Sequence, residues 1–144
     1  ELCWCSKQDG LEKVLILDTK FLDELTEKAK ESPRLRMNYN LHDSLDSKAQ
    51  RLFNGLEPGT VLPTHRHVET SETYILVRGA LRVTLLDDDK NVIETAELNL
   101  NNGVFGLHIP ANTWHKVDVL ESGTVIFEVK DGPYTPLTSD NILE

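Results

Sequence analysis

Apolar and polar residues alternate along most of the chain after residue 50. Such alternation places one face of a strand against a core and leaves the other face in solvent. Turn clusters rich in glycine, asparagine and aspartate separate the alternating runs. The runs cover residues 50–56, 72–78, 81–86, 92–97, 103–109, 116–120 and 124–130. Short strands at this regular spacing predict an all-β sandwich or barrel, and a jelly roll fits the pattern best.

One earlier segment, residues 19–31, has a helical period instead. Its apolar side chains share one face, which predicts an amphipathic helix. Asp18 or Thr19 can cap the start of this helix. Ser32 and Pro33 end it, because a residue before proline avoids the helical conformation. The apolar face consists of Phe21, Leu22, Leu25 and Ala29.

The length of 144 residues suits one compact domain, and no internal repeat divides the chain. We expect four consecutive parts. The first part is a disordered leader (1–12), the third is the barrel (48–136) and the fourth is a tail (137–144). The second part (13–47) packs on the barrel and contains a short strand at 14–17, the helix and an irregular segment. Cys3 and Cys5 are the only cysteines, and their spacing is too close for a relaxed disulfide.

The charge balance disfavours several classes of partner. The chain has 15 basic and 24 acidic residues, a net charge of −9. Nucleic acids and anionic membranes bind basic surfaces, so neither partner is expected. No apolar run reaches the roughly 18 residues that span a bilayer, and no signal-peptide pattern is visible. These observations predict a cytoplasmic protein.

Four side chains have the spacing of a metal site. His65 and His67 project the same way if they lie on a strand, Glu72 follows them, and His115 comes after a turn at Pro110. An isolated pair of histidines at this spacing more often lies on a solvated strand, so the prediction depends on all four residues. Three imidazoles and a carboxylate suit a divalent transition metal such as zinc, iron, nickel or manganese. Four protein ligands on an ion that takes six would leave positions open for chemistry.

Two glycines bracket this stretch, and the joint pattern resembles the cupin superfamily. The first cupin motif is matched by Gly59, His65, His67, Glu72 and Gly79. The second is matched in part, by Pro110, Asn112 and His115. Asn112 replaces the usual glycine, but asparagine also adopts left-handed turns; Val119 and the position of Gly103 depart as well. The resemblance implies a single-domain, RmlC-like jelly-roll barrel with a short N-terminal strand and helix, and these four metal ligands.

Most of residues 34–134 also resemble the narrower WbuC type of cupin metalloprotein. The similar stretches are 36–43, 50–67 and 127–134. Ser71 replaces the tryptophan usual before the ligand glutamate, and the tail after Tyr134 differs. That family is associated with bacterial surface-polysaccharide gene clusters, so the resemblance implies a role there but no particular reaction.

Further polar residues in these stretches are candidates for the ligand pocket. If the basic ones converge near the metal, they favour an anionic ligand such as a carboxylate or a sugar phosphate. Otherwise they are surface groups paired with the many acids. The candidate ligand-binding residues are Arg36, Asn38, His42, Arg51, Lys130 and Tyr134.

Three functions are compatible with this site. The first is a metal-dependent isomerase or epimerase that acts on a sugar or nucleotide-linked sugar. The second is a non-haem iron dioxygenase with the same ligands. The third is a non-catalytic module that binds a small molecule through its metal. The fold does not choose among them, so the sequence leaves open whether the protein is an enzyme. Because cupins often pair through sheet edges, a homodimer is expected.

Overall fold

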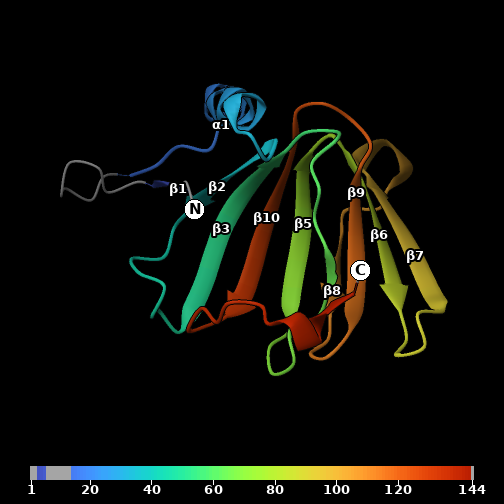
Figure 1. Ribbon diagram of the computed structural model, residues 1–144. Helices are drawn as coiled ribbons and strands as arrows, with labels where there is room; N and C mark the ends of the chain where they lie inside the picture. Colours follow the sequence, from blue (N-terminus) through green and yellow to red (C-terminus); the bar gives the residue numbers. More distant parts are fainter. Residues whose placement is uncertain (1–2, 6–13, 144) are drawn as a thin grey trace.

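The computed structural model describes residues 3–5 and 14–143, which form two facing β-sheets and one α-helix (Figure 1). The first sheet has the order β1–β2–β3–β10–β5–β8 and the second the order β11–β4–β9–β6–β7. The first sheet consists of β1 (Cys3–Cys5), β2 (Arg36–Asn40), β3 (Ala49–Leu56), β10 (Thr124–Asp131), β5 (Glu72–Arg78) and β8 (Gly106–Ile109). The second consists of β11 (Ile142–Leu143), β4 (Thr64–His65), β9 (Trp114–Val119), β6 (Ala80–Leu86) and β7 (Val92–Asn99). The predicted all-β barrel is confirmed.

The apolar core lies between the two sheets, toward one end of the barrel. Leu56, Leu76 and Ile126 from the first sheet are buried in one cluster with Val83 and Val117 from the second. The strand register places the last residues of β3 and β5 beside the first residues of β10, so these apolar side chains gather at the same end. The other end of the barrel is left to polar side chains.

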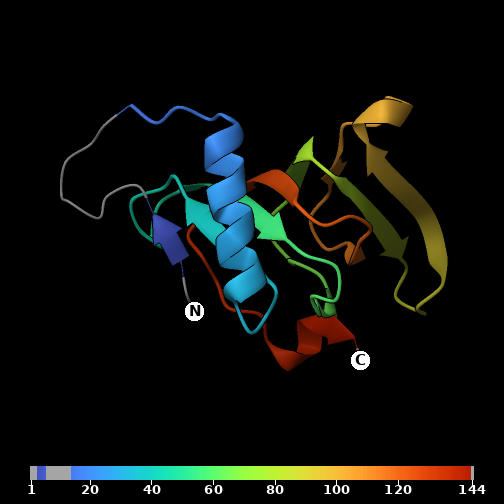
Figure 2. The same ribbon diagram turned by 90° about the horizontal axis from the view of Figure 1, so that it is seen from above.

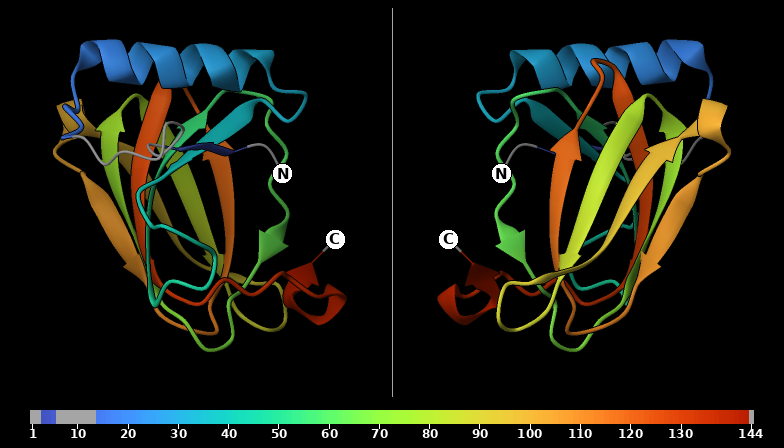
Figure 3. Two further views of the ribbon diagram at one scale, coloured as in Figure 1. Left: turned by 90° about the vertical axis from the view of Figure 1, so that its left-hand side faces the viewer. Right: turned by 90° about the vertical axis from the view of Figure 1, so that its right-hand side faces the viewer.

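A second apolar cluster joins the helix α1 (Thr19–Glu31) to the outer face of the first sheet (Figures 2 and 3). Phe21 packs edge-on against Tyr39, with ring centroids 5.0 Å apart, and against Phe53 at 5.4 Å. Leu25 and Ala29 are also buried, as the helical period predicted. The helix bounds and its amphipathic face are therefore confirmed.

Replacing Asp18 with alanine is expected to lower the free energy of unfolding by about 1 kcal/mol. Asp18 caps α1, because its Oδ1 accepts a hydrogen bond of 2.9 Å from the backbone nitrogen of Phe21. Urea unfolding measures the loss, and Asp18→Asn, which keeps a capping oxygen, should restore most of it. An alanine variant as stable as the original chain would contradict this role.

The N-terminal region differs from the prediction in three places. Residues 14–17 are not a strand, although they are apolar; Cys3–Cys5 forms β1 instead and occupies the edge of β2 in parallel pairing. The rest of the expected leader, residues 1–2 and 6–12, lies outside the described residues. Residues 36–40 are also not irregular but form β2. Their Arg-Met-Asn-Tyr-Asn pattern alternates, with Met37 and Tyr39 packed in the helix cluster.

The C-terminal segment crosses the end of the barrel opposite α1 (Figures 1 and 3). Within the expected tail, the 3-10 turn η2 (Ser139–Asn141) leads into β11, which pairs with β4 and thus joins the second sheet. A second 3-10 turn, η1 (Leu100–Asn102), follows β7.

Among the helices of the described chain, none is long and apolar enough to cross a membrane.

Candidate metal centre

Three imidazoles and one carboxylate converge at the polar end of the barrel. His65 lies on β4, His67 follows it in a loop, Glu72 begins β5, and His115 lies on β9. Each offers one ligand atom, and these atoms all lie within 4.8 Å of one another. The pairing of His65 with His115 across β4 and β9 brings the two sequence motifs together. Glu72 and His115 are buried, and the other two are half-buried.

Backbone carbonyl groups orient two of the imidazoles. Nδ1 of His65 lies 2.8 Å from the carbonyl oxygen of Pro63, and Nδ1 of His115 lies 3.0 Å from that of Thr113. Because a carbonyl oxygen only accepts, each Nδ1 carries the hydrogen and each Nε2 keeps its lone pair. Metal-binding histidines commonly have such a partner on the far nitrogen.

Glu72 lies at the centre of the cluster. The hydroxyl of Tyr74 donates a hydrogen bond of 2.6 Å to its Oε1. Nε2 of His115 lies 3.0 Å from the same oxygen, and Nε2 of His67 lies 3.5 Å from Oε2. A carboxylate that is only 3% exposed is costly to bury without partners of this kind.

The pKa values of two imidazoles and of the carboxylate suit metal binding, and that of His115 opposes it. Burial, followed by the charge of His115, lowers the pKa of His65 to about 4, and burial also lowers the pKa of His67. Both are therefore neutral at pH 7, as metal binding requires. Burial lowers the pKa of His115 as well, but contact with the Glu72 carboxylate outweighs it and the net pKa is raised. Burial raises the pKa of Glu72, but His115 and His67 reverse this and bring it to about 2.

The residues present fit a divalent transition metal. When His115 is neutral, the lone pair of its buried Nε2 faces Oε1 of Glu72 at 3.0 Å with no hydrogen between them. Leaving such an atom unsatisfied costs about 1–3 kcal/mol, and a metal bond would satisfy it. Imidazole suits zinc, iron and nickel, and carboxylate also suits manganese.

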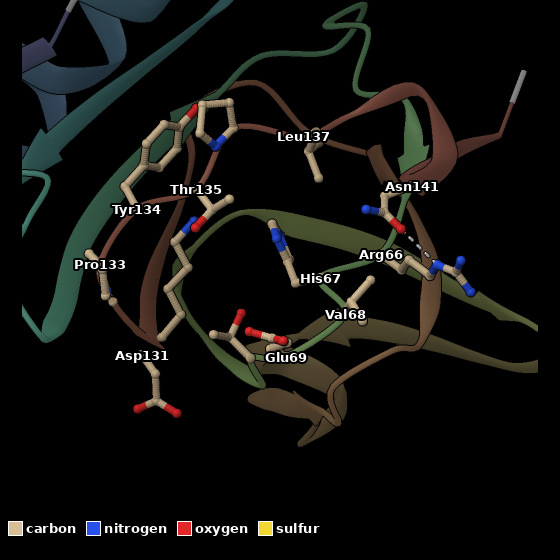
Figure 4. Close-up of a pocket in the computed structure, with 14 residues that line it drawn as sticks. Arg66, His67, Val68, Glu69, Asp131, Pro133, Tyr134, Thr135, Leu137 and Asn141 are labelled. Carbon is tan, nitrogen blue, oxygen red and sulfur yellow. Dashed lines mark hydrogen bonds between the residues drawn. The ribbon is translucent and has the colours of Figure 1, made fainter.

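A pocket of about 380 Å³ opens beside His67 (Figure 4). Residues 66–70 form one wall, and residues 130–137 with Asn141 form the other. Arg66 joins the walls, because its Nε donates a hydrogen bond of 3.0 Å to Oδ1 of Asn141. Two predicted ligand-binding residues, Lys130 and Tyr134, line this pocket.

The other predicted ligand-binding residues lie farther from the cluster. Arg36 pairs with Leu56 at the apolar end of the barrel and donates a hydrogen bond of 2.8 Å to the carbonyl of Val61. Asn38 is on the inner face of β2. Nδ1 of His42 contacts the backbone of Arg51, whose side chain is exposed on the outer face of β3. The structure therefore does not bring Arg36, His42 or Arg51 to the metal ligands.

Sequence reasoning missed two polar residues inside the barrel, Tyr74 and Glu128. The alternating run 72–78 predicts only a strand position for Tyr74, and its hydrogen bond to Glu72 depends on the local strand geometry. Glu128 lies on the inner face of β10, where Nδ2 of Asn54 donates a hydrogen bond of 3.0 Å to its Oε1. A charged residue at a core position of the alternating run 124–130 was the available signal.

A sequence family and several solved structures match this chain. The family described as "Domain of unknown function (DUF6016)" matches residues 17–98, which is more than half of the chain. The matched range includes α1 and three of the four candidate ligands, and His115 lies beyond it. No curated protein matches the sequence.

The structural matches are cupin-fold proteins. KdgF from Halomonas sp. matches with a TM-score of 0.56 and 18% identity, over 72% of this chain and 84% of KdgF. CapF, solved with the inhibitor 3-isopropenyl-tropolone, gives a TM-score of 0.54 and 17% identity over 69% of this chain and 28% of CapF. A variant of the Bacillus subtilis oxalate decarboxylase OxdC gives a TM-score of 0.50 and 21% identity, over 61% of this chain and 22% of OxdC. The chain therefore belongs to the DUF6016 family and has the fold of the cupin superfamily.

Proposed function

We propose that this protein binds a divalent transition metal through His65, His67, Glu72 and His115 and acts there on a small anionic or sugar-type ligand. The observation that carries the proposal is the convergence of four ligand atoms within 4.8 Å, beside a pocket of about 380 Å³. Small-molecule sites span roughly 300–1,000 Å³, so this pocket suits a ligand the size of a sugar phosphate.

One residue of the pocket, Lys130, supports an anionic ligand. Lys130 makes no ion pair with a carboxylate in the part of the chain that the structure describes. Its charge reaches the cluster, because it contributes to the lowered pKa of His67. An ammonium group in this position favours a carboxylate or phosphate. Tyr134 and Leu137 offer apolar surface for the carbon skeleton.

The bound metal would polarise a carbonyl or hydroxyl group of the ligand. The residues of the chain would hold that ligand, with Lys130 at its anionic end and Tyr134 against its carbon atoms. We infer an isomerase or epimerase in bacterial surface-polysaccharide metabolism, supported by the resemblance of residues 34–134 to WbuC-type cupins. The identity of the native metal distinguishes this isomerase or epimerase from the alternative function, a non-haem iron dioxygenase. Zinc or nickel at full occupancy supports the proposal, whereas iron with ligand-dependent oxygen uptake favours the dioxygenase.

A homodimer is also part of this proposal. Ile75, Phe105 and Val129 are exposed apolar residues of the first sheet and the segment before β8, with exposures of 45%, 58% and 37%. Neighbouring apolar groups on an outer sheet face favour self-association. Light scattering that gives the mass of a dimer supports the proposal, and the mass of a monomer contradicts it.

Replacing Lys130 with methionine is expected to weaken the binding of glucose 1-phosphate to the metal-loaded protein by roughly tenfold or more, the effect of a lost charged hydrogen bond. Binding of uncharged glucose and metal content should not change. Isothermal titration calorimetry measures both affinities. Lys116→Met is the matched control, because Lys116 lies exposed on β9 outside the pocket. If both variants bound glucose 1-phosphate with equal affinity, Lys130 would not be part of the ligand site.

A further inference from the structure

The inner face of β10 leads from the apolar core to the pocket. Ile126 lies in the core, Lys130 lines the pocket, and Glu128 lies between them. The strand register places Glu128 opposite Tyr74 and Lys130 opposite Glu72 on β5. The Glu128 carboxyl therefore faces the same interior as the candidate metal ligands, one step deeper in the barrel.

Glu128 is fixed by an amide group and not by a cation. Nδ2 of Asn54 donates a hydrogen bond of 3.0 Å to its Oε1. No basic group of the described chain forms an ion pair with Glu128. Glu128 is only half-buried, so part of the residue stays accessible.

Charged groups on three strands act on this carboxyl. Burial comes first, and together with the negative charge of Glu72 on β5 it raises the pKa of Glu128. Asn54 on β3, then Lys130 on β10 and His115 on β9 lower it. The net pKa is about 7. A carboxyl group in this range can both take up and return a proton at neutral pH.

We propose that Glu128 is the proton-transfer residue of this site and that it acts on a carbon next to a carbonyl group of the bound ligand. This inference rests on the proposed function. Glu128 takes the proton from a carbon that bears a hydroxyl group and lies next to the carbonyl group. The electron pair of that C–H bond forms a C=C bond, and the carbonyl oxygen takes the negative charge. The hydroxyl proton then moves to this oxygen, and Glu128 returns its proton to the former carbonyl carbon, which leaves the carbonyl group on the neighbouring carbon and gives the isomer. No oxidant or co-reactant is consumed.

The two acidic groups of β5 that face this interior, Glu72 and Tyr74, are unsuited to this step. Glu72 faces the imidazoles and accepts the hydrogen bond of Tyr74, so its oxygens are already engaged. Burial, followed by the charge of Glu72, raises the pKa of Tyr74 well above its usual value, so this hydroxyl stays protonated. The amide group of Asn54 is not acidic, and Asn54 positions Glu128 through its hydrogen bond.

Hydrogen exchange into small keto compounds tests the proposal. Metal-loaded protein is incubated in D₂O with pyruvate or dihydroxyacetone phosphate, and loss of the carbon-bound proton signal is followed by NMR. Glu128→Gln should slow exchange by roughly 100-fold or more, and Glu128→Asp should restore part of it. The rate of the original chain should rise with pH as Glu128 deprotonates, and Glu128→Gln should lack this rise.

Controls separate this inference from the proposed function. Glu94→Gln, at an exposed position of β7, should exchange like the original chain. Infrared spectra of metal-free protein should show a protonated carboxyl band that titrates near neutral pH and is missing in Glu128→Gln. Metal content is measured on every sample. If the original chain holds no metal, the proposed function fails. If metal is retained but the chain catalyses no exchange, or Glu128→Gln exchanges as fast, only the role of Glu128 is overturned.

Discussion

Replacing His115 with alanine is expected to lower metal affinity by roughly 100-fold or more, since even a residue that only orients a ligand contributes 10–100-fold. His115 is fully buried, its Nδ1 is held by the carbonyl of Thr113, and its Nε2 has no hydrogen bond. Its loss removes a ligand atom that is already positioned, and no other described imidazole can replace it. Metal content after dialysis and calorimetric titration measure the effect.

His108→Ala is the matched control for this experiment. His108 is exposed on β8, and its Nδ1 lies 2.9 Å from Oγ1 of Thr73, outside the cluster. It should bind metal as the original chain does. Stoichiometric metal in the His115 variant, at unchanged affinity, would show that the ligand assignment is wrong. Circular dichroism of both variants establishes that the barrel is still folded.

The protonation of His115 also gives metal binding a pH dependence. Contact with Glu72 raises the pKa of His115, so a proton competes with the metal at this nitrogen. Metal affinity should therefore fall as the pH falls through the pKa of His115. The His115→Ala variant should lose part of this dependence, and metal uptake should release fewer protons. An identical pH dependence in both proteins would contradict the competition.

Replacing Gly79 with alanine is expected to lower the free energy of unfolding by about 3–5 kcal/mol, from backbone strain and steric overlap together. Gly79 joins β5 to β6 with a φ of +89°, a conformation that side chains disfavour. A Cβ there would also lie 2.6 Å from the Cα of Thr124, in addition to its overlap with the hydroxyl of that residue. Thr124 is fully buried in β10, so it has little freedom to move.

Gly103→Ala separates the two contributions. Gly103 also has a positive φ, +72°, but a Cβ there would meet no atom within 4 Å. Its replacement should cost only about 1–2 kcal/mol, the strain of the left-handed conformation. Chemical unfolding of both variants gives the comparison. If Gly79→Ala loses no more than Gly103→Ala, the close approach of Thr124 has no energetic effect.

The left-handed turn in the second motif is a feature that local sequence chemistry could predict. Asn112 replaces a usual glycine, and its φ of +62° is the conformation that asparagine tolerates best outside glycine. Alternation predicted the positions of most barrel strands in the same way. The helical period and the Asp18 cap predicted the helix at 19–31. These features depend on neighbours in the chain, so the sequence could predict them.

Pairing between distant strands produced the features that local reasoning missed. Residues 14–17 have a strand-like composition but form no strand, and the strand beside β2 is β1 instead. Arg51 and Lys130 are both basic residues of first-sheet strands, yet only Lys130 faces the pocket, since the register turns Arg51 outward. A strand pattern gives two faces but does not say which one a partner sheet covers.

The sequence by itself predicted most strands of the barrel, the helix and the four candidate ligands, because spacing and alternation are local properties. The tertiary structure decided that β4 and β9 bring His65 beside His115, that the C-terminal segment forms a wall of the pocket, and that Glu128 faces the cluster. Each of these depends on which distant strands pair and in which register. That choice depends on the packing of the whole barrel and not on any one segment.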